Sequence, residues 1–159
     1  MRYYKLKPEV AGQIGPKSKL TYESKMVKEV DMVKEVKMVK EVIFLEYVFY
    51  GWLGDELLTS TPCFIITKKL KQDIVGNHLT GFQIDKVKIS FSQEYLELGG
   101  SIFLPKFVRL KPIESYEENK NNLIKDFYYN ECKDLIVSER ALQVISQHKI
   151  SMCVIEELK

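Results

Sequence analysis

The chain has 159 residues, of which 45% are hydrophobic and 29% charged, as is ordinary for a globular protein. We expect one domain over residues 1–159, because a chain of this length can bury a sizeable core. The net charge of +2 is too small to indicate nucleic-acid binding by itself, and it argues against a strongly acidic mimic of DNA. No stretch approaches 18 apolar residues in length, so no membrane-spanning helix is predicted.

The cysteines indicate a reduced, cytoplasmic protein. Cys63, Cys132 and Cys153 form no CxxC pair, and the start of the chain lacks an apolar run of signal-peptide length. Two of them, Cys63 and Cys153, stand within apolar runs, which predicts buried structural thiols. His and Cys residues are too few at compatible spacing for a zinc site, so neither a metal nor a cofactor is predicted.

The N-terminal third contains a tandem repeat. Residues 2–6 are predicted to form a strand and residues 8–16 a loop. A hexapeptide then occurs three times over residues 26–43, as MVKEVD, MVKEVK and MVKEVI. Inserting six residues keeps each side chain of a strand on its face, whereas it turns the apolar stripe of a helix by about 240°. This favours an extended segment, although Lys, Glu and Met also favour a helix. A tolerated length insertion explains the array more simply than a binding stalk does.

Residues 43–50 give the strongest strand signal of the chain, and the block that follows them, residues 51–58, contains two glycines. In this block Asp55 is expected to cap a short helical turn, and the sole tryptophan, Trp52, to anchor the core. The functional alternative is a presented loop in which Trp52, Asp55 and Glu56 contact a partner, because tryptophan is frequent in interface hot spots. Adjacent carboxylates are usually surface charges, so a catalytic acid pair is the weaker interpretation.

Two segments, 62–87 and 133–158, repeat one pattern at a constant offset of 71 residues. Each predicts a buried strand, a hydroxyl N-cap, a helix of about two turns, a tight turn and a second strand. A histidine near each helix end is expected to cap the helix on the surface. The predicted parts are strands 63–66 and 134–137, caps Thr67 and Ser138, helices 68–76 and 139–148, histidines His78 and His148, and strands 81–90 and 152–156.

The remaining segments complete an α+β fold with a mixed, largely antiparallel sheet. Residues 92–104, which contain Gly99-Gly100, are predicted to form a loop, and residues 105–110 a strand. Residues 111–122 are polar and expected to be exposed, whereas residues 124–129 fit either a strand or a short helix.

Four segments resemble a group of bacterial immunity proteins from polymorphic toxin systems. The matching residues are Tyr3-Tyr4-Lys5-Leu6, Gly51-Trp52-Leu53-Gly54-Asp55-Glu56-Leu57-Leu58, Pro62-Cys63-Phe64-Ile65-Ile66-Thr67 and Val137-Ser138-Glu139-Arg140-Ala141-Leu142. The resemblance implies a cytoplasmic α+β protein that binds and blocks a cognate toxin. It carries no catalytic residues, because such proteins act by binding.

The sequence therefore predicts a non-catalytic binding protein whose partner is a cognate protein toxin, with neither nucleic acid nor a membrane as partner. Two alternatives remain open. One is a homodimeric scaffold joined through residues 26–42. The other is a small hydrolase that uses Asp55 or Glu56, which would require a deep polar pocket with perturbed carboxylates around them.

Overall fold

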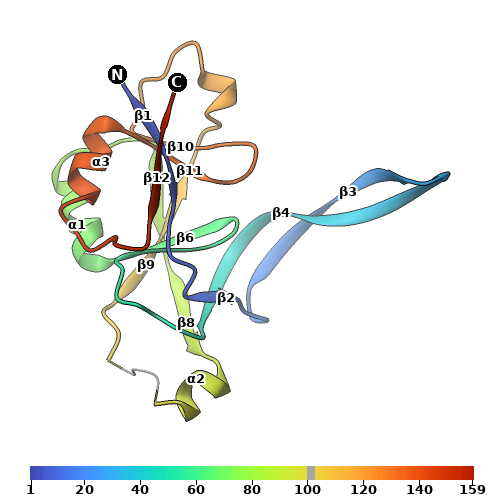
Figure 1. The fold of residues 1–159 in the computed structure, drawn as a ribbon, viewed down its shortest axis with the longest axis horizontal. Coiled ribbons are helices and arrows are strands. Elements are labelled where there is room, and N and C mark those ends of the chain that lie inside the picture. Colours follow the sequence, from blue (N-terminus) through green and yellow to red (C-terminus); the bar gives the residue numbers. More distant parts are fainter. Residues whose placement is uncertain (100–102) are drawn as a thin grey trace.

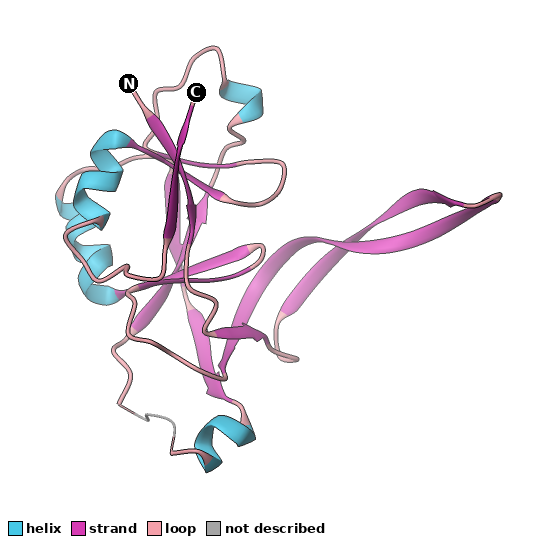
Figure 2. Ribbon diagram, in the orientation of Figure 1, coloured by secondary structure: helices cyan, strands magenta, loops and turns pink. Residues whose placement is uncertain are grey.

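The computed structural model describes residues 1–99 and 103–159, in which three four-stranded, largely antiparallel sheets are accompanied by short helices (Figures 1 and 2). The predicted α+β class is confirmed. The elements are β1 (Tyr3–Lys7), β2 (Gly12–Ile14), β3 (Lys19–Glu29), β4 (Met32–Phe49), β5 (Leu57–Ser60), β6 (Cys63–Thr67), α1 (Lys68–Gly76), β7 (Phe82–Asp85), β8 (Val87–Phe91), α2 (Gln93–Glu97), β9 (Phe107–Pro112), a 3-10 turn (Glu117–Asn119), β10 (Phe127–Tyr129), β11 (Leu135–Ser138), α3 (Glu139–Ile145) and β12 (Val154–Leu158).

Two of the sheets are built alike. One has the strand order β5-β6-β9-β7 and the other β10-β11-β1-β12, and all neighbours are antiparallel. The predicted strand–helix–strand units supply β6-α1-β7 to the first sheet and β11-α3-β12 to the second. In each unit a strand from elsewhere in the chain lies between the unit's own two strands. That inserted strand is β9 in the first sheet and the N-terminal β1 in the second.

The inserted strands match in sequence as well as in position. Phe107-Val108-Arg109-Leu110-Lys111-Pro112 in β9 corresponds to Tyr3-Tyr4-Lys5-Leu6-Lys7-Pro8 in and after β1. Arg109 stands opposite Ile65, as Lys5 stands opposite Ile136. The residues directly before the two inserted strands accept equivalent hydrogen bonds. The carbonyl of Lys106 accepts from the amide of Lys68 (2.8 Å), and the carbonyl of Arg2 accepts from the amide of Glu139 (2.9 Å). The internal repeat of segments 62–87 and 133–158 therefore extends to a third strand in each half, which the 71-residue offset does not reveal.

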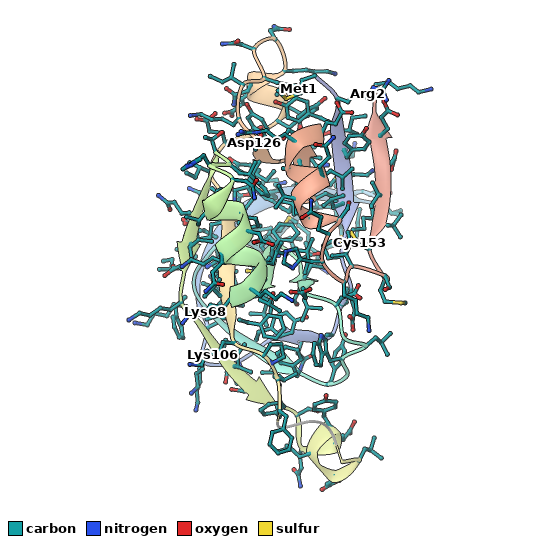
Figure 3. The ribbon with its side chains drawn as sticks, turned by 90° about the vertical axis from the view of Figure 1, so that its left-hand side faces the viewer. Met1, Arg2, Lys68, Lys106, Asp126 and Cys153 are labelled. Atoms are coloured by element: carbon teal, nitrogen blue, oxygen red, sulfur yellow. The ribbon has the colours of Figure 1, made fainter. Side chains whose placement is uncertain are left out.

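The two units share one core. Helices α1 and α3 pack against each other beside the two sheets (Figures 1 and 3). Both predicted N-caps are confirmed, because the hydroxyls of Thr67 and Ser138 accept hydrogen bonds from the amides of Leu70 and Ala141, each at 3.1 Å. The shared core is apolar and contains Leu6, Leu57, Phe64, Ile66, Leu70, Ile74, Leu110, Phe127, Leu135, Val137, Ala141 and Ile145.

The third sheet carries a long hairpin. Strand β4 pairs with β2 and β3 in antiparallel fashion and with β8 in parallel. Its C-terminal part is anchored in a second core by Leu45, Tyr47 and Phe49, each with an exposed fraction of 0%. Every residue from 22 to 41 is exposed, and these residues form the arm that projects from the body in Figure 1. The hexapeptide array is thus extended, as predicted, but it folds back on itself at Val30-Asp31.

Several predictions differ from the structure. No helical turn follows Asp55; strand β5 begins two residues later. The predicted strand 81–90 is divided between β7 and β8, which belong to different sheets. The predicted loop 92–104 contains α2, whose N-cap is Ser92, while residues 100–102 lie outside the described part of the chain. Strand β2 lies within the predicted loop 8–16.

Candidate functional site

The arm presents large apolar side chains to solvent. Alternation along its strands places each valine and methionine beside charged neighbours, so neither face of the ribbon forms a core of its own. Cross-strand pairs show the same mixture, for example Val27 opposite Lys34 and Lys28 opposite Val33. An exposed apolar surface of this kind marks an interaction site more often than an isolated exposed residue does. The exposed apolar residues are Tyr22, Met26, Val27, Val30, Met32, Val33, Val36, Met38 and Val39, with Val30 at 93% and Met26 at 69%.

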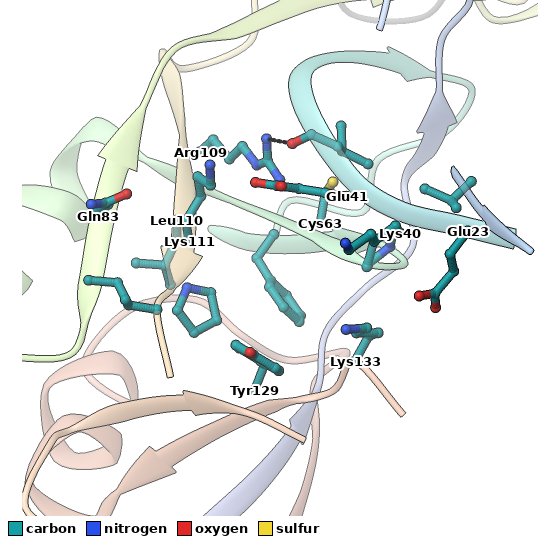
Figure 4. A pocket seen from close by; sticks show the side chains of 16 residues that line it. Glu23, Lys40, Glu41, Cys63, Gln83, Arg109, Leu110, Lys111, Tyr129 and Lys133 are labelled. Carbon is teal, nitrogen blue, oxygen red and sulfur yellow. Dashed lines mark hydrogen bonds between the residues drawn. The ribbon is translucent and has the colours of Figure 1, made fainter. Parts of the chain in front are cut away.

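A pocket of about 550 Å³ lies where the arm joins the body (Figure 4). Strand β4 lines it with residues 39–42, β9 with residues 109–112, and the turns before β6 and after β10 close it. Cationic side chains outnumber anionic ones. The cations are Lys40, Arg109, Lys111 and Lys133, and the anions are Glu23 and Glu41.

Arg109 is the most unusual residue of this pocket. Only 6% of its surface is exposed, and one guanidinium nitrogen, Nη1, donates to the main-chain carbonyl of Val42 at 2.6 Å. Its Nε is buried and lacks a hydrogen-bond partner, which is true of no other buried side-chain nitrogen or oxygen in the described residues. Sequence reasoning missed Arg109. The signal was present, because the segment around Arg109 repeats that around Lys5.

The three predicted partner-contacting residues lie elsewhere, at a corner that holds the fold together. Trp52 packs edge-on against Phe107, with ring centroids 6.3 Å apart, and its indole nitrogen donates to the carbonyl of Asp55 at 2.9 Å. Asp55 is fully buried, and its carboxylate accepts hydrogen bonds from the amides of Ser151 (3.0 Å) and Met152 (2.8 Å). The Asp55 carboxylate is therefore inaccessible to a partner in this fold.

Glu56 also has internal partners. Its carboxylate accepts hydrogen bonds from the hydroxyl of Thr67 (2.8 Å) and the amide of Lys149 (3.1 Å), and Oε1 lies 3.1 Å from Nδ1 of His148. Burial opposes ionisation of Glu56, but these hydrogen bonds outweigh it and hold the pKa of its carboxyl below the ordinary value. Nε2 of His148 lies 2.6 Å from Asp73 Oδ2, and only 4% of the His148 side chain is exposed, so the predicted surface role of His148 is wrong.

Asp126, which is labelled in Figure 3, makes the equivalent contacts in the other half. Its carboxylate accepts hydrogen bonds from the cap hydroxyl of Ser138 (2.7 Å), the amide of Thr80 (2.8 Å) and the guanidinium of Arg140 (2.8 Å). Glu56 and Asp126 thus each join the start of one helix to the turn that follows the other helix. We call these two sites the carboxylate latches. Their chemistry is structural, because each carboxylate oxygen already accepts hydrogen bonds within the chain.

The hydrolase alternative finds little support at this corner. A hollow of about 540 Å³ is lined by Trp52, Glu56 and four lysines, among other residues. A general acid needs a raised pKa, whereas the pKa of Glu56 is lowered. Of the two thiols predicted to be buried, Cys63 is buried and Cys153 partly so; burial raises the pKa of both, in Cys153 to about 11, which opposes thiolate formation.

Residues 1–99 and 103–159 contain no cluster of three or more His, Cys, Asp or Glu side chains suited to a metal ion. Within the same ranges, no helix has both the length and the apolar character to cross a membrane. Comparison of the chain with protein-family models, with curated proteins and with solved structures gave no match.

Proposed function

We propose that this protein is a non-catalytic protein-binding module and that the arm is its primary contact element. The observation that carries the proposal is the exposure of every residue from 22 to 41, including two methionines near the tip, Met26 and Met32, at 69% and 67%. Methionine adapts its shape to a partner at low cost, and the ribbon offers unpaired strand edges for pairing.

The partner proposed is a cognate bacterial toxin, and the site of action is the cytoplasm. The resemblance of four segments to immunity proteins supports this assignment, and a binding role agrees with latch carboxylates that are fully engaged within the chain. In this mechanism the rigid body anchors the arm, and the arm covers the toxin's active site or holds the toxin inactive. Trp52, Asp55 and Glu56 hold one corner of this body together through their internal hydrogen bonds.

The test is co-expression with toxin domains encoded beside the gene. The sharpest variant replaces residues 26–35 by Asn-Gly, which joins the cross-strand pair Lys25 and Val36 through a tight two-residue turn. This variant is expected to fold, since it removes only exposed residues, and to lose complex formation and protection. Met32→Lys on the arm and Leu98→Lys on the body form a matched pair, because both side chains are highly exposed (67% and 88%). Protection by the shortened protein equal to that of the intact one would refute the role of the arm.

A second candidate function, a homodimeric scaffold, is favoured by the arm sequence. On the outer edge of β4, β8 pairs only along Leu45–Phe49 in the described structure, so Val33-Lys34-Glu35-Val36 is free for strand addition. Antiparallel pairing of this segment with its copy sets valine against valine and lysine against glutamate. Light scattering distinguishes a dimer from a monomer. Lys34→Glu alone should dissociate such a dimer, and Lys34→Glu with Glu35→Lys should restore it; a monomer at all concentrations excludes this candidate.

A further inference from the structure

We propose that the pocket at the base of the arm is an oxyanion-binding site in which Arg109 receives a carboxylate or phosphate group. The guanidinium carries a positive charge and offers donors in a planar fork that matches either group. The other cations that line the pocket, Lys40, Lys111 and Lys133, increase its preference for a negative ligand. The volume of about 550 Å³ is within the range of small-molecule sites and admits an acidic side chain.

Arg109 is a buried cation. A buried cation is costly unless an opposite charge or several acceptors compensate it. Only 6% of the Arg109 surface is exposed, and Nη1 of its guanidinium donates a hydrogen bond to the carbonyl of Val42. Its Nε has no hydrogen-bond acceptor. Among the described residues, no carboxylate forms an ion pair with the Arg109 guanidinium at 4 Å or less. An oxyanion entering the pocket would supply the missing negative charge.

The other half of the molecule shows what the same position does when it is internally paired. Lys5 corresponds to Arg109 and faces Glu156 across the strands, and the two form an ion pair at 3.1 Å. Arg109 faces Asp85 in the equivalent register. Asp85, however, is exposed and accepts a hydrogen bond from the amide of Lys86 (2.8 Å), while Arg109 turns toward β4. In the pocket half, the charge of the central cation thus has no ion-pair partner among the described residues.

The pocket also differs from the Lys5 site because strand β4 lines it. In Figure 4, the Arg109 side chain lies between β9 and β4, and its hydrogen bond to Val42 is drawn as a dashed line; Glu41 also lines the pocket. Val42 is the first buried residue after the exposed arm. A ligand held by Arg109 would therefore lie next to the point at which the arm joins the body.

The cellular source of the oxyanion depends on the proposed function. If the arm binds a protein, an acidic side chain of that partner is the natural occupant, placed next to the arm's own contact. The oxyanion site itself does not depend on it, because a small anion can be tested on the isolated chain. Failure of the pocket and failure of toxin binding are then separate outcomes.

The experiment titrates the ¹⁵N-labelled full chain with sodium phosphate and, in parallel, with sodium acetate at constant ionic strength. The expected result is saturable movement of the Arg109 Nε–Hε signal and of amide signals in residues 40–42, 109–111 and 133. A response to both anions assigns the site to carboxylates as well as phosphates, whereas a response to phosphate alone assigns it to phosphoryl groups. No saturable change with either anion, or a change confined to other parts of the chain, overturns the proposal.

Matched variants test the role of Arg109. Arg109→Lys should weaken phosphate binding about tenfold or more, since it removes a charge-assisted fork, whereas Lys28→Gln on the arm should change it less than about twofold. Should Arg109→Lys unfold, Lys133→Gln on the exposed rim is expected to weaken binding several-fold by the loss of one charge. Glu41→Gln and Asp85→Asn test for an internal counter-ion. If either variant tightens binding about tenfold, that carboxylate occupies Arg109 in solution and the proposal is wrong.

Discussion

Replacing Asp126 with asparagine should strongly destabilise the protein, because it removes the charge from one of the two carboxylate latches. Asp126 is 3% exposed and accepts hydrogen bonds from Ser138, Thr80 and Arg140 at 2.7–2.8 Å. Asparagine keeps the shape but replaces one acceptor oxygen with a donor that faces N–H groups. A hydrogen bond to a charged group contributes about 1.5–3 kcal/mol, and removing one partner of a buried ion pair costs about 3–5 kcal/mol. Because the Arg140 side chain is 52% exposed, we expect a loss near the lower end, about 3 kcal/mol.

The assay is urea denaturation followed by the fluorescence of Trp52, the sole tryptophan. The matched control is Glu157→Gln, which removes a carboxylate from an exposed pair with Arg2 (3.6 Å; side chains 49% and 66% exposed) and should cost less than about 1 kcal/mol. Equal losses for the two variants would refute the structural role of the Asp126 latch.

The latch also predicts a pH dependence. Burial opposes ionisation of Asp126, but hydrogen bonds from Arg140, Ser138 and Thr80 outweigh it, so its native pKa lies below the ordinary value. The unfolded chain then binds a proton more readily than the native one. The stabilisation is fully present above the unfolded pKa of about 4 and is lost as the pH falls toward the native pKa. Asp126→Asn should remove this part of the acid dependence of the unfolding free energy.

Three further predictions concern other parts of the molecule. Thr67→Ala and Ser138→Ala should each lower the free energy of unfolding by about 1–2 kcal/mol, because each removes an N-cap. Thr59→Ala removes a buried hydroxyl outside the caps and serves for comparison. An unchanged urea midpoint for either cap variant would contradict the assignment of that residue as an N-cap. At pH 8 a thiol reagent should modify exposed Cys132 first, and modification of buried Cys63 at the same rate would show that its site opens readily. Shortening the arm by replacing residues 26–35 should leave the urea midpoint almost unchanged, and a large fall would show that the arm contributes to the core.

Local patterns in the sequence were enough to predict both strand–helix–strand units. Thr67 and Ser138 lie at the ends of buried strands, directly before amphipathic segments, and their caps form as expected because capping needs only residues three apart. The arm was also accessible, since a six-residue period fits the two-residue repeat of a strand. Its reversal at Val30-Asp31 was not predicted, because the turn lacks the usual glycine and both residues adopt positive φ values of 20° and 64°.

Charged residues were the hardest to place. Asp55, Arg109 and His148 belong to types that are usually exposed, so each was assigned to the surface or not singled out. Their burial depends on partners far along the chain. Asp55 binds amides 96 and 97 residues away, His148 lies against Glu56 92 residues away, and Arg109 donates to a carbonyl 67 residues away.

The sequence by itself determined the local elements: the paired helices with their caps, the strands beside them and the extended arm. These follow from side-chain periodicity and from hydrogen bonds between near neighbours. Only the tertiary structure decided that β1 completes the sheet of the C-terminal unit and β9 that of the other. It also decided that Asp55 is sealed inside while Arg109 faces a pocket. Strand insertion and burial are set by contacts across the whole chain, so side-chain periodicity and capping within one segment do not determine them.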